Sequence, residues 1–311
     1  MEQGNVTSVE QFILLGFSHL PNERVALIFC FTCVYMFILL GNSLIILLVF
    51  KDQHLHNPMY LLLANFSFID LITPSISVPK MISDLVSREC AISYTDCMVQ
   101  MFFYIIITVT ESYFLSVMSF DRYLAICFPL HYTMIMTNKT CVVLICGAWV
   151  FGGINAIIHT VLTINVDFCG PNHVRHFFCD TLSLLQLACS GIKLNIIVIS
   201  VSTFLNGICN FLITLSSYIG IVSTILQINS KKGRIKSFYT CVSHLIVVSL
   251  FYGTLIFTYF QPDSSYTVSK DLSAPVIYTT VTPALNPFIY SLRNNDIKKA
   301  TKRLIWKGPV T

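Results

Sequence analysis

One stretch of the chain, residues 100–129, decides the fold: QMFFYIIITVTESYFLSVMSFDRYLAICFP. Across residues 98–120 the only charged residue is Glu111, so this segment is long and apolar enough to cross a bilayer as a helix. A carboxylate near the middle of such a helix is costly and needs a partner, a cation or water. The acid–base pair Asp121-Arg122 follows, where the helix is expected to reach the water boundary.

The composition of the whole chain agrees with a membrane protein. Hydrophobic residues make up 55% of the 311 residues and charged residues only 11%, whereas a soluble domain carries about 25% charge. Backbone polar groups in lipid must be paired within a segment, so long apolar segments are expected to be helices. The predicted fold is an all-α seven-transmembrane helix bundle, with spans near residues 25–50, 58–83, 98–120, 140–163, 195–228, 238–260 and 272–292.

The distribution of positive charge predicts the orientation. Thirteen of the 19 Lys and Arg residues lie in loops one, three and five or in the C-terminal tail, and such an excess marks the cytoplasmic side. We expect an extracellular tail over residues 1–22, a transmembrane domain over 23–293 and a cytoplasmic amphipathic helix and tail over 294–311. Residues 1–22 contain no basic segment followed by an apolar core, so no cleavable signal peptide is predicted.

Each tail contains a short sequence pattern with a structural meaning. Asn5-Val6-Thr7 is an acceptor for N-glycosylation on the side predicted to be external. Near the C-terminus, apolar residues recur on one helical face with Lys and Arg on the other, which predicts a short eighth helix lying on the inner leaflet. The residues on the first face are Ile297, Ala300, Thr301, Leu304 and Ile305.

Three of the polar residues within the apolar spans are candidates for buried polar contacts. Asn42 is compatible with a simple packing hydrogen bond between helices. Asp70 and Glu111 together favour a functional role, because two buried acids need a shared cation, proton or water cluster.

Four cysteines are expected on the external side: Cys97, Cys169, Cys179 and Cys189. An even number in an oxidising compartment favours two disulfides, and three pairings are open. The alternative is a zinc or copper site, because His173 and His176 lie between Cys169 and Cys179 at metal-like spacing.

The cytoplasmic side is basic before the sixth span, at Lys231, Lys232, Arg234 and Lys236. These charges suit either inner-leaflet lipid headgroups or an acidic partner protein. In the seventh span, Pro283 and Pro287 each remove a backbone hydrogen bond, which predicts a hinge.

Several strings at fixed mutual spacing resemble the olfactory receptors of vertebrates, a branch of the rhodopsin-like (class A) G protein-coupled receptors. They occur from the first span to the tail: LHNPMY (55–60), MSFDRYLAIC (118–127), KSFYTCVSH (236–244) and PALNPFIYSLRN (283–294). Ser119-Phe120 and Tyr239 are small departures from the family pattern. Tyr252, where non-olfactory relatives usually carry Trp, favours the olfactory branch.

The resemblance implies an odorant receptor of the plasma membrane with an extracellular N-terminus. It pairs Cys97 with Cys179 and Cys169 with Cys189. It also implies a polar core of Asp70 and Glu111, with Asn42 and Asn286 nearby, that is able to hold a sodium ion. The residues that it implies in G protein coupling are Asp121, Arg122, Tyr123, Tyr218, Lys236 and Tyr290. On activation, Arg122 would be released from Asp121.

Helical spacing suggests which residues line the odorant pocket that the family has between helices three, five, six and seven. Residues at i, i+3, i+4 and i+7 share one helix face. About half of them are expected to be true contacts with a small, mostly hydrophobic volatile. The candidates are Met101, Tyr104, Ile105, Thr108, Ser202, Asn206, Tyr252, Leu255, Ile256, Tyr259, Tyr278 and Thr279.

The main hypothesis is an odorant-activated receptor that couples to a heterotrimeric stimulatory G protein of olfactory type and raises cyclic AMP. The alternatives are a non-olfactory small-molecule class A receptor and an ion-coupled transporter or channel. A transporter predicts internal repeats, and the two halves show no similarity. An enzyme is not expected, because no metalloprotease, nucleophile-elbow or phosphate-loop motif occurs. No nucleic acid partner and no further cofactor are expected.

Overall fold

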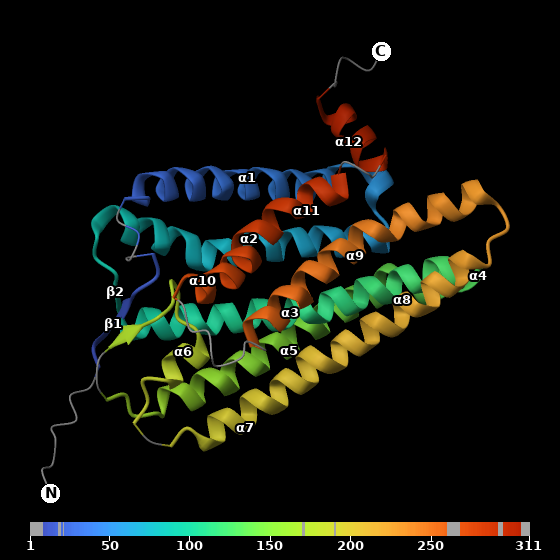
Figure 1. The fold of residues 1–311 in the computed structure, drawn as a ribbon. Helices are drawn as coiled ribbons and strands as arrows, with labels where there is room; N and C mark the ends of the chain where they lie inside the picture. The colour runs from blue at the N-terminus through green and yellow to red at the C-terminus, as the bar shows by residue number, and fades with distance from the viewer. Residues whose placement is uncertain are drawn as a thin grey trace, which may run out of the picture.

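The computed structural model of the chain describes residues 9–17, 20, 22–169, 172–189, 191–259, 268–291 and 295–305. Within these ranges, seven long helical segments form one bundle (Figure 1). The predicted seven-helix fold is confirmed. The segments are α1 (Arg24–Lys51), α2 (Pro58–Ser87), α3 (Tyr94–Cys127), α5 (Asn138–Ile164), α7 (Lys193–Ser202) continued by η2 (Thr203–Cys209) and α8 (Asn210–Leu226), α9 (Lys231–Tyr259), and α10 (Val268–Val276) continued by η4 (Ile277–Val281) and α11 (Thr282–Ser291).

The outer surface of the bundle is apolar, as lipid requires. Five helical segments of the described residues are long and apolar enough to cross a membrane: α1, α2, α3, α5 and Lys193–Leu226. The apolar part of α9 is shorter, His244–Ile256, and the helix begins at Lys231 in the basic stretch, before the sixth span predicted near residues 238–260. Phe29, Val143 and Val150 are each more than half exposed on the outside, which suits contact with lipid.

Short elements join the spans. Figure 1 shows β1 and α12 at opposite ends of the bundle, as a chain with an odd number of crossings requires. The helical connectors are η1 (Gln53–Leu55), α4 (Pro129–Ile135), α6 (Thr181–Leu185) and the amphipathic α12 (Asn295–Ile305). Helix α12 buries Ile297 and Ala300 against the cytoplasmic ends of α1 and α2, and Arg303 Nη2 lies 2.6 Å from Asp52 Oδ2.

Local sequence explains where the helices begin. Asn57 accepts a hydrogen bond from Tyr60 N at 3.3 Å, and Pro58 occupies the first position of α2, where its missing N–H costs nothing. Ser93 Oγ accepts from Asp96 N at 3.0 Å and caps α3 in the same way.

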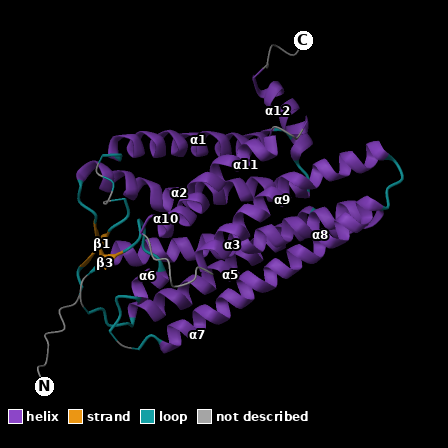
Figure 2. Cartoon of the chain, in the orientation of Figure 1, coloured by secondary structure: helices purple, strands orange, loops and turns teal. Residues whose placement is uncertain are grey.

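A small β-sheet closes the external end, which the all-α prediction did not include (Figure 2). Strand β1 (Gln11–Leu14) pairs antiparallel with β2 (Ala91–Ser93) and parallel with β3 (His173–Val174). Phe12 and Leu14 are buried while alternate residues are not, the period of a half-buried strand. The strands are short and come from the N-terminal tail and two external loops, so no local pattern revealed them. Asn5 lies outside the described residues.

Two π-helical turns interrupt otherwise α-helical spans, one in the fifth span and one in the seventh. Element η2 divides the fifth span, and η4 precedes Pro283 in the seventh. At η4, Thr282 N donates to Ile277 O, five residues earlier. The expected hinge at Pro283 and Pro287 therefore includes a widened turn before the first proline.

Helices α3 and α5 approach closely at Gly152. A Cβ added there would lie 2.8 Å from Ile106 O and would also overlap Thr110, whereas a Cβ on Gly153 would meet nothing within 4 Å. We expect Gly152→Ala to force the two helices apart and to reduce the fraction of receptor that reaches the cell surface severalfold. Gly153→Ala is the matched control and should leave surface expression unchanged or slightly higher, since Ala favours helix over Gly by about 1 kcal/mol. Flow cytometry of an N-terminally tagged receptor measures both, and equal expression of the two variants would contradict the close packing.

Candidate functional site

A cavity of about 140 Å³ opens between α3, α5, α6, the fifth span and α9. It is smaller than the about 300–1,000 Å³ of sites for drug-sized ligands, so its occupant must be small. Apolar side chains cover most of its wall, with several hydroxyl and amide groups among them. The lining residues are Tyr104, Ile105, Thr108, Val109, Ser112, His159, Asp180, Thr181, Leu182, Ile199, Ser202, Thr203, Asn206, Gly207, Phe251 and Leu255.

Half of the twelve pocket candidates from the sequence lie on this wall. Tyr104, Ile105 and Thr108 come from α3, Ser202 and Asn206 from the fifth span, and Leu255 from α9. The sequence missed the contributions of α5 and of the second external loop, most notably His159 and Asp180. Helical spacing could have placed His159 one turn beyond Asn155, but only the tertiary fold shows that this face of α5 meets the cavity.

Three other candidates are displaced from the cavity by packing. Met101 is fully buried in the external core, in one hydrophobic cluster with Phe12 of β1, and does not line the cavity. Tyr252 is buried inside the bundle core, with its ring against Phe211. Ile256 is 53% exposed and faces outward, because it follows Leu255 by 100° around α9.

The two described candidates of the seventh span, Tyr278 and Thr279, make hydrogen bonds inside the bundle and do not line the cavity. Tyr278 is buried and its hydroxyl donates to Glu111 Oε2 at 2.6 Å and to Thr108 Oγ1 at 3.4 Å. Thr279 is fully buried and its hydroxyl donates to Pro275 O within its own span. The side chain of Tyr259 lies outside the described residues.

A hydrogen-bond network on one wall of the cavity is centred on Asn206. Its Nδ2 donates to Asn155 Oδ1 at 3.0 Å and to Ser202 Oγ at 2.9 Å. Its Oδ1 accepts from the Tyr113 hydroxyl at 2.8 Å, and its backbone carbonyl accepts from Ser112 Oγ. The π-turn η2 contains Asn206, so the widened turn carries the amide that connects α3, α5 and the fifth span.

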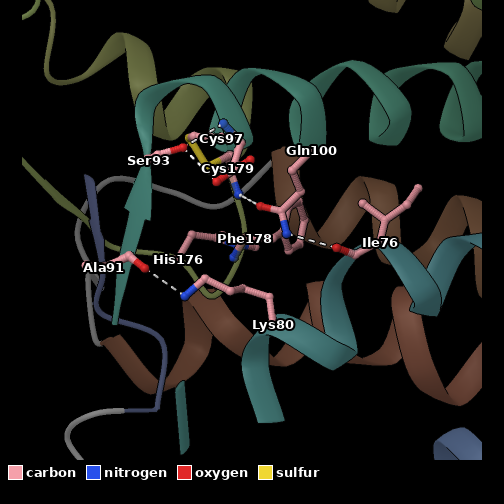
Figure 3. Close-up of a disulfide and its surroundings, with 10 residues drawn as sticks. Ile76, Lys80, Ala91, Ser93, Cys97, Gln100, His176, Phe178 and Cys179 are labelled. Carbon is pink, nitrogen blue, oxygen red and sulfur yellow. Dashed lines mark hydrogen bonds between the residues drawn. A yellow bond between two sulfur atoms is a disulfide. The ribbon is translucent and has the colours of Figure 1, made fainter. Parts of the chain in front are cut away.

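The second external loop covers the cavity and is fastened by two disulfides, Cys97–Cys179 and Cys169–Cys189. Gln100 links this loop to α2, because its Oε1 accepts from Cys179 N and its Nε2 donates to Ile76 O, both at 2.9 Å (Figure 3). Phe178 then packs on Tyr104, a residue of the cavity wall, with ring centroids 4.4 Å apart.

The metal alternative for this loop is wrong, since both cysteines it needs are oxidised in disulfides. His173 lies on the edge strand β3, while His176 is buried between Phe177 and Phe178. Burial lowers the pKa of His176 to about 4, with Asp180 and the Phe178 amide acting in the opposite direction. The His176 side chain therefore stays neutral at physiological pH and acts as a packing group.

The buried acids have separate partners. Asn286 Nδ2 donates to both carboxylate oxygens of Asp70 at 2.9 Å, while Glu111 is held by Tyr278. Among the described side chains, Asn42 Oδ1 and Asn286 Oδ1 are buried and accept no hydrogen bond. Hard cations prefer oxygen ligands, and the Asp70 carboxylate with the free Asn286 Oδ1 beside it offers oxygens of this kind.

At the cytoplasmic end, Asp121 is clamped between two helices. Its Oδ2 accepts from Arg122 Nη2 at 2.7 Å, and its Oδ1 accepts from the Tyr132 hydroxyl of α4 at 2.8 Å. The Asp121 side chain is 1% exposed and that of Arg122 only 15%. The sequence predicted the Asp121–Arg122 pair but missed Tyr132, because α4 was not expected.

A second contact joins the fifth span to α9 at the same end. The Tyr218 hydroxyl hydrogen-bonds to His244 Nδ1, and their rings stack. Tyr123 lies against the fifth span, where a Cβ on Gly220 would come within 2.6 Å of its ring. The side chains of Lys236 and Tyr290 lie outside the described residues.

Comparison with known proteins agrees with this architecture. The family model described as "Olfactory receptor" matches residues 29–307. Olfactory receptor 1G1 of Gorilla gorilla gorilla is 45% identical over 306 residues, which are 98% of each chain. Olfactory receptor 1E5 of Pan troglodytes is 46% identical over 303 residues, covering 97% of this chain and 96% of that relative. Olfactory receptor 1F1 of Homo sapiens is 44% identical over 305 residues, 98% of each chain.

The family model and these relatives cover nearly the whole chain, from the first helix to α12. They agree with the multi-pass plasma-membrane topology and exclude an enzyme, a transporter or a receptor of another branch. The chain belongs to the olfactory receptor family.

Proposed function

We propose that the receptor binds a small, mostly hydrophobic odorant in the cavity between α3, α5, the fifth span and α9, and activates a stimulatory G protein of olfactory type. The observation that carries this proposal is the cavity itself. It lies under the second external loop, is mostly apolar, and shares Ser112 and Asn206 with a network that extends toward the cytoplasm.

That network supplies a physical route between the two ends. Ser112 Oγ accepts from Asn210 Nδ2 at 3.2 Å, and one turn further Ser116 Oγ donates to Asn210 O at 3.1 Å and contacts Thr214 Oγ1 at 3.3 Å. Tyr218 follows one turn later with its bond to His244 of α9. An odorant that displaces Asn206 therefore moves the fifth span, which contacts α9 through Tyr218 and His244.

Activation in this proposal is a population shift. The odorant favours the state in which α9 swings outward, by binding that state more tightly than the resting one. Breaking the Tyr218–His244 contact and loosening Arg122 from Asp121 would open a cytoplasmic cleft for the G protein. The exposed Lys231, Lys232 and Arg234 at the start of α9 offer positive charge beside it.

We also propose that the polar core of Asp70, Asn42 and Asn286 holds a sodium ion in the resting state. When bound, the ion would neutralise the carboxylate and supply a partner for the two free amide oxygens. Glu111 would face this cluster from α3.

The test is a panel of volatile compounds applied to cells that express the receptor, with cyclic AMP as the readout. We expect at least one compound to raise cyclic AMP several-fold in cells that contain the stimulatory G protein. The same compound should have no effect in cells that lack this G protein or the receptor. A response that persists without the G protein, or an ionic current in its place, would refute the coupling.

A further inference from the structure

We propose that His159 is the hydrogen-bonding group that selects the odorant, and that the odorant class is a neutral volatile with one oxygen function, such as an alcohol or an aldehyde. This inference rests on the proposed function and names the chemistry of the same cavity. It follows from asking which polar groups on the cavity wall are still free to bind a ligand.

Most of the polar groups on the wall are already engaged by the protein. Both N–H groups of Asn206 are donated to Asn155 and Ser202, and its oxygen accepts from Tyr113. The Ser202 hydroxyl is donated to Asn155 Oδ1 at 3.0 Å. Ser112 and Thr108 donate to the backbone carbonyls of Asn206 and Tyr104. The amide and the hydroxyls expected to anchor the odorant therefore serve mainly to hold helices together.

His159 differs from these groups. It is only 8% exposed and lines the cavity, yet within the described part of the chain its imidazole makes no hydrogen bond. Thr181 and Thr203 also line the cavity without a side-chain bond, but neither is buried. The ring nitrogens of His159 are not among the buried, unpartnered side-chain atoms of the described residues, so they are accessible from the cavity. A neutral imidazole offers one donor and one acceptor. A hydroxyl or carbonyl oxygen on the odorant supplies the missing partner.

The position of His159 is well fixed. It lies one helical turn from Asn155, whose Oδ1 is bonded to Ser202 and Asn206. The same helix is packed tightly on α3 through Gly152. The imidazole is therefore presented from a rigid wall, and a site of this kind rejects analogues that lack the hydrogen-bonding group.

The charges of the wall narrow the ligand class further. The lining residues include no Lys or Arg that could pair with a carboxylate ligand. The one charged lining residue, Asp180, caps α6 and accepts from Leu182 N at 3.1 Å and from Ser183 N at 3.2 Å. Its charge repels a carboxylate, and its capping bonds leave it committed to the loop. A neutral oxygenated molecule needs no cationic partner and is not repelled by Asp180.

The experiment uses a matched series of eight-carbon probes: octan-1-ol, octanal, octanoate, octylamine and octane. Each is applied to cells expressing the full-length receptor, and cyclic AMP gives a dose response. We expect octan-1-ol or octanal to be the most potent probe on the wild type. In His159→Phe, which keeps an aromatic ring at this position and removes both nitrogens, the potency of that probe should fall about tenfold, equivalent to about 1.4 kcal/mol. Its advantage over octane should largely disappear.

Two further variants separate hydrogen bonding from packing. His159→Gln keeps a donor and an acceptor and should retain most of the preference for the oxygenated probe. Ile158→Phe is the matched control, because Ile158 is the neighbouring residue and is 44% exposed on the outer side of α5; it should not change potency. Surface expression is measured for all variants so that a loss of folding is recognised.

Some outcomes overturn the assignment while leaving the proposed function intact. These are an unchanged dose response in His159→Phe, equal loss in His159→Gln, or octanoate or octylamine as the most potent probe. If no probe of the series and no compound of the wider panel raises cyclic AMP, the proposed function fails, and the assignment of His159 fails with it.

Discussion

Arg122→Ala should abolish odorant-evoked cyclic AMP while the receptor still reaches the cell surface. The Arg122 guanidinium lies at the cytoplasmic end of α3, paired with an almost fully buried Asp121. Its removal takes away the positive charge proposed to meet the G protein and leaves a buried carboxylate that still accepts from the Tyr132 hydroxyl. We expect the maximal response to fall below about a tenth of the wild-type value, because charge complementarity with the G protein is lost at this position.

The matched control is Arg303→Ala. Arg303 is also a cytoplasmic arginine paired with an aspartate, Asp52, but its side chain is 47% exposed and belongs to α12. Exposed ion pairs contribute about 0–1 kcal/mol, so this variant should signal nearly normally. Equal signalling by Arg122→Ala and the wild type would contradict the role given to Arg122.

Tyr132→Phe tests the clamp on Asp121 from the other side. It removes the hydrogen bond from α4 and leaves the charge pair in place. Because a hydrogen bond to a charged group is worth about 1.5–3 kcal/mol, the resting state should lose stability and basal cyclic AMP should rise. A basal level at or below that of the wild type would show that α4 does not restrain Arg122.

Loss of the Cys97–Cys179 disulfide should remove most of the receptor from the cell surface. The bond closes a loop with a sequence separation of 82 residues, for which the chain-entropy relation gives about 4.5 kcal/mol. It also positions Cys179 N against Gln100 and Phe178 against Tyr104. A stability loss of this size is a large share of the about 5–15 kcal/mol by which native proteins are stable.

Other cysteines of the chain provide graded comparisons. The Cys169–Cys189 bond spans only 20 residues, which corresponds to about 3.3 kcal/mol, so Cys169→Ser should be less damaging than Cys97→Ser. Cys146 is a free, exposed cysteine of α5, and Cys146→Ser should have no effect. Quantified surface labelling ranks the three variants; normal surface levels of Cys97→Ser would show that the disulfide is dispensable for folding.

Much of the architecture was accessible from the sequence because the bilayer acts on every span in the same way. Apolar length predicts the helices, and the Lys and Arg distribution predicts their direction. Motifs with fixed spacing identified the family. The Asp121–Arg122 pair and the pairing of Asp70 with Asn286 involve residues that these motifs already marked.

The pocket was only half predictable, since helical periodicity gives the face of a residue but not its neighbour. Met101 and Tyr104 share one face of α3, yet the former belongs to the external core cluster that includes Phe12 and the latter lines the cavity. Periodicity also gave no weight to His159, which a single-helix pattern cannot distinguish from a core histidine. Asn206 and Tyr278 lie in π-turns, so their side chains point in other directions than a regular α-helix would give them.

The sequence by itself determined that the chain crosses the membrane seven times as helices, in which direction, and to which family it belongs, because lipid penalises every unpaired backbone group and misplaced charge regardless of the neighbours. The tertiary structure alone decided which polar groups remain free to meet an odorant. That outcome depends on hydrogen bonds between residues as far apart as Tyr113, Asn155 and Asn206, and such partners are assigned only when the helices pack.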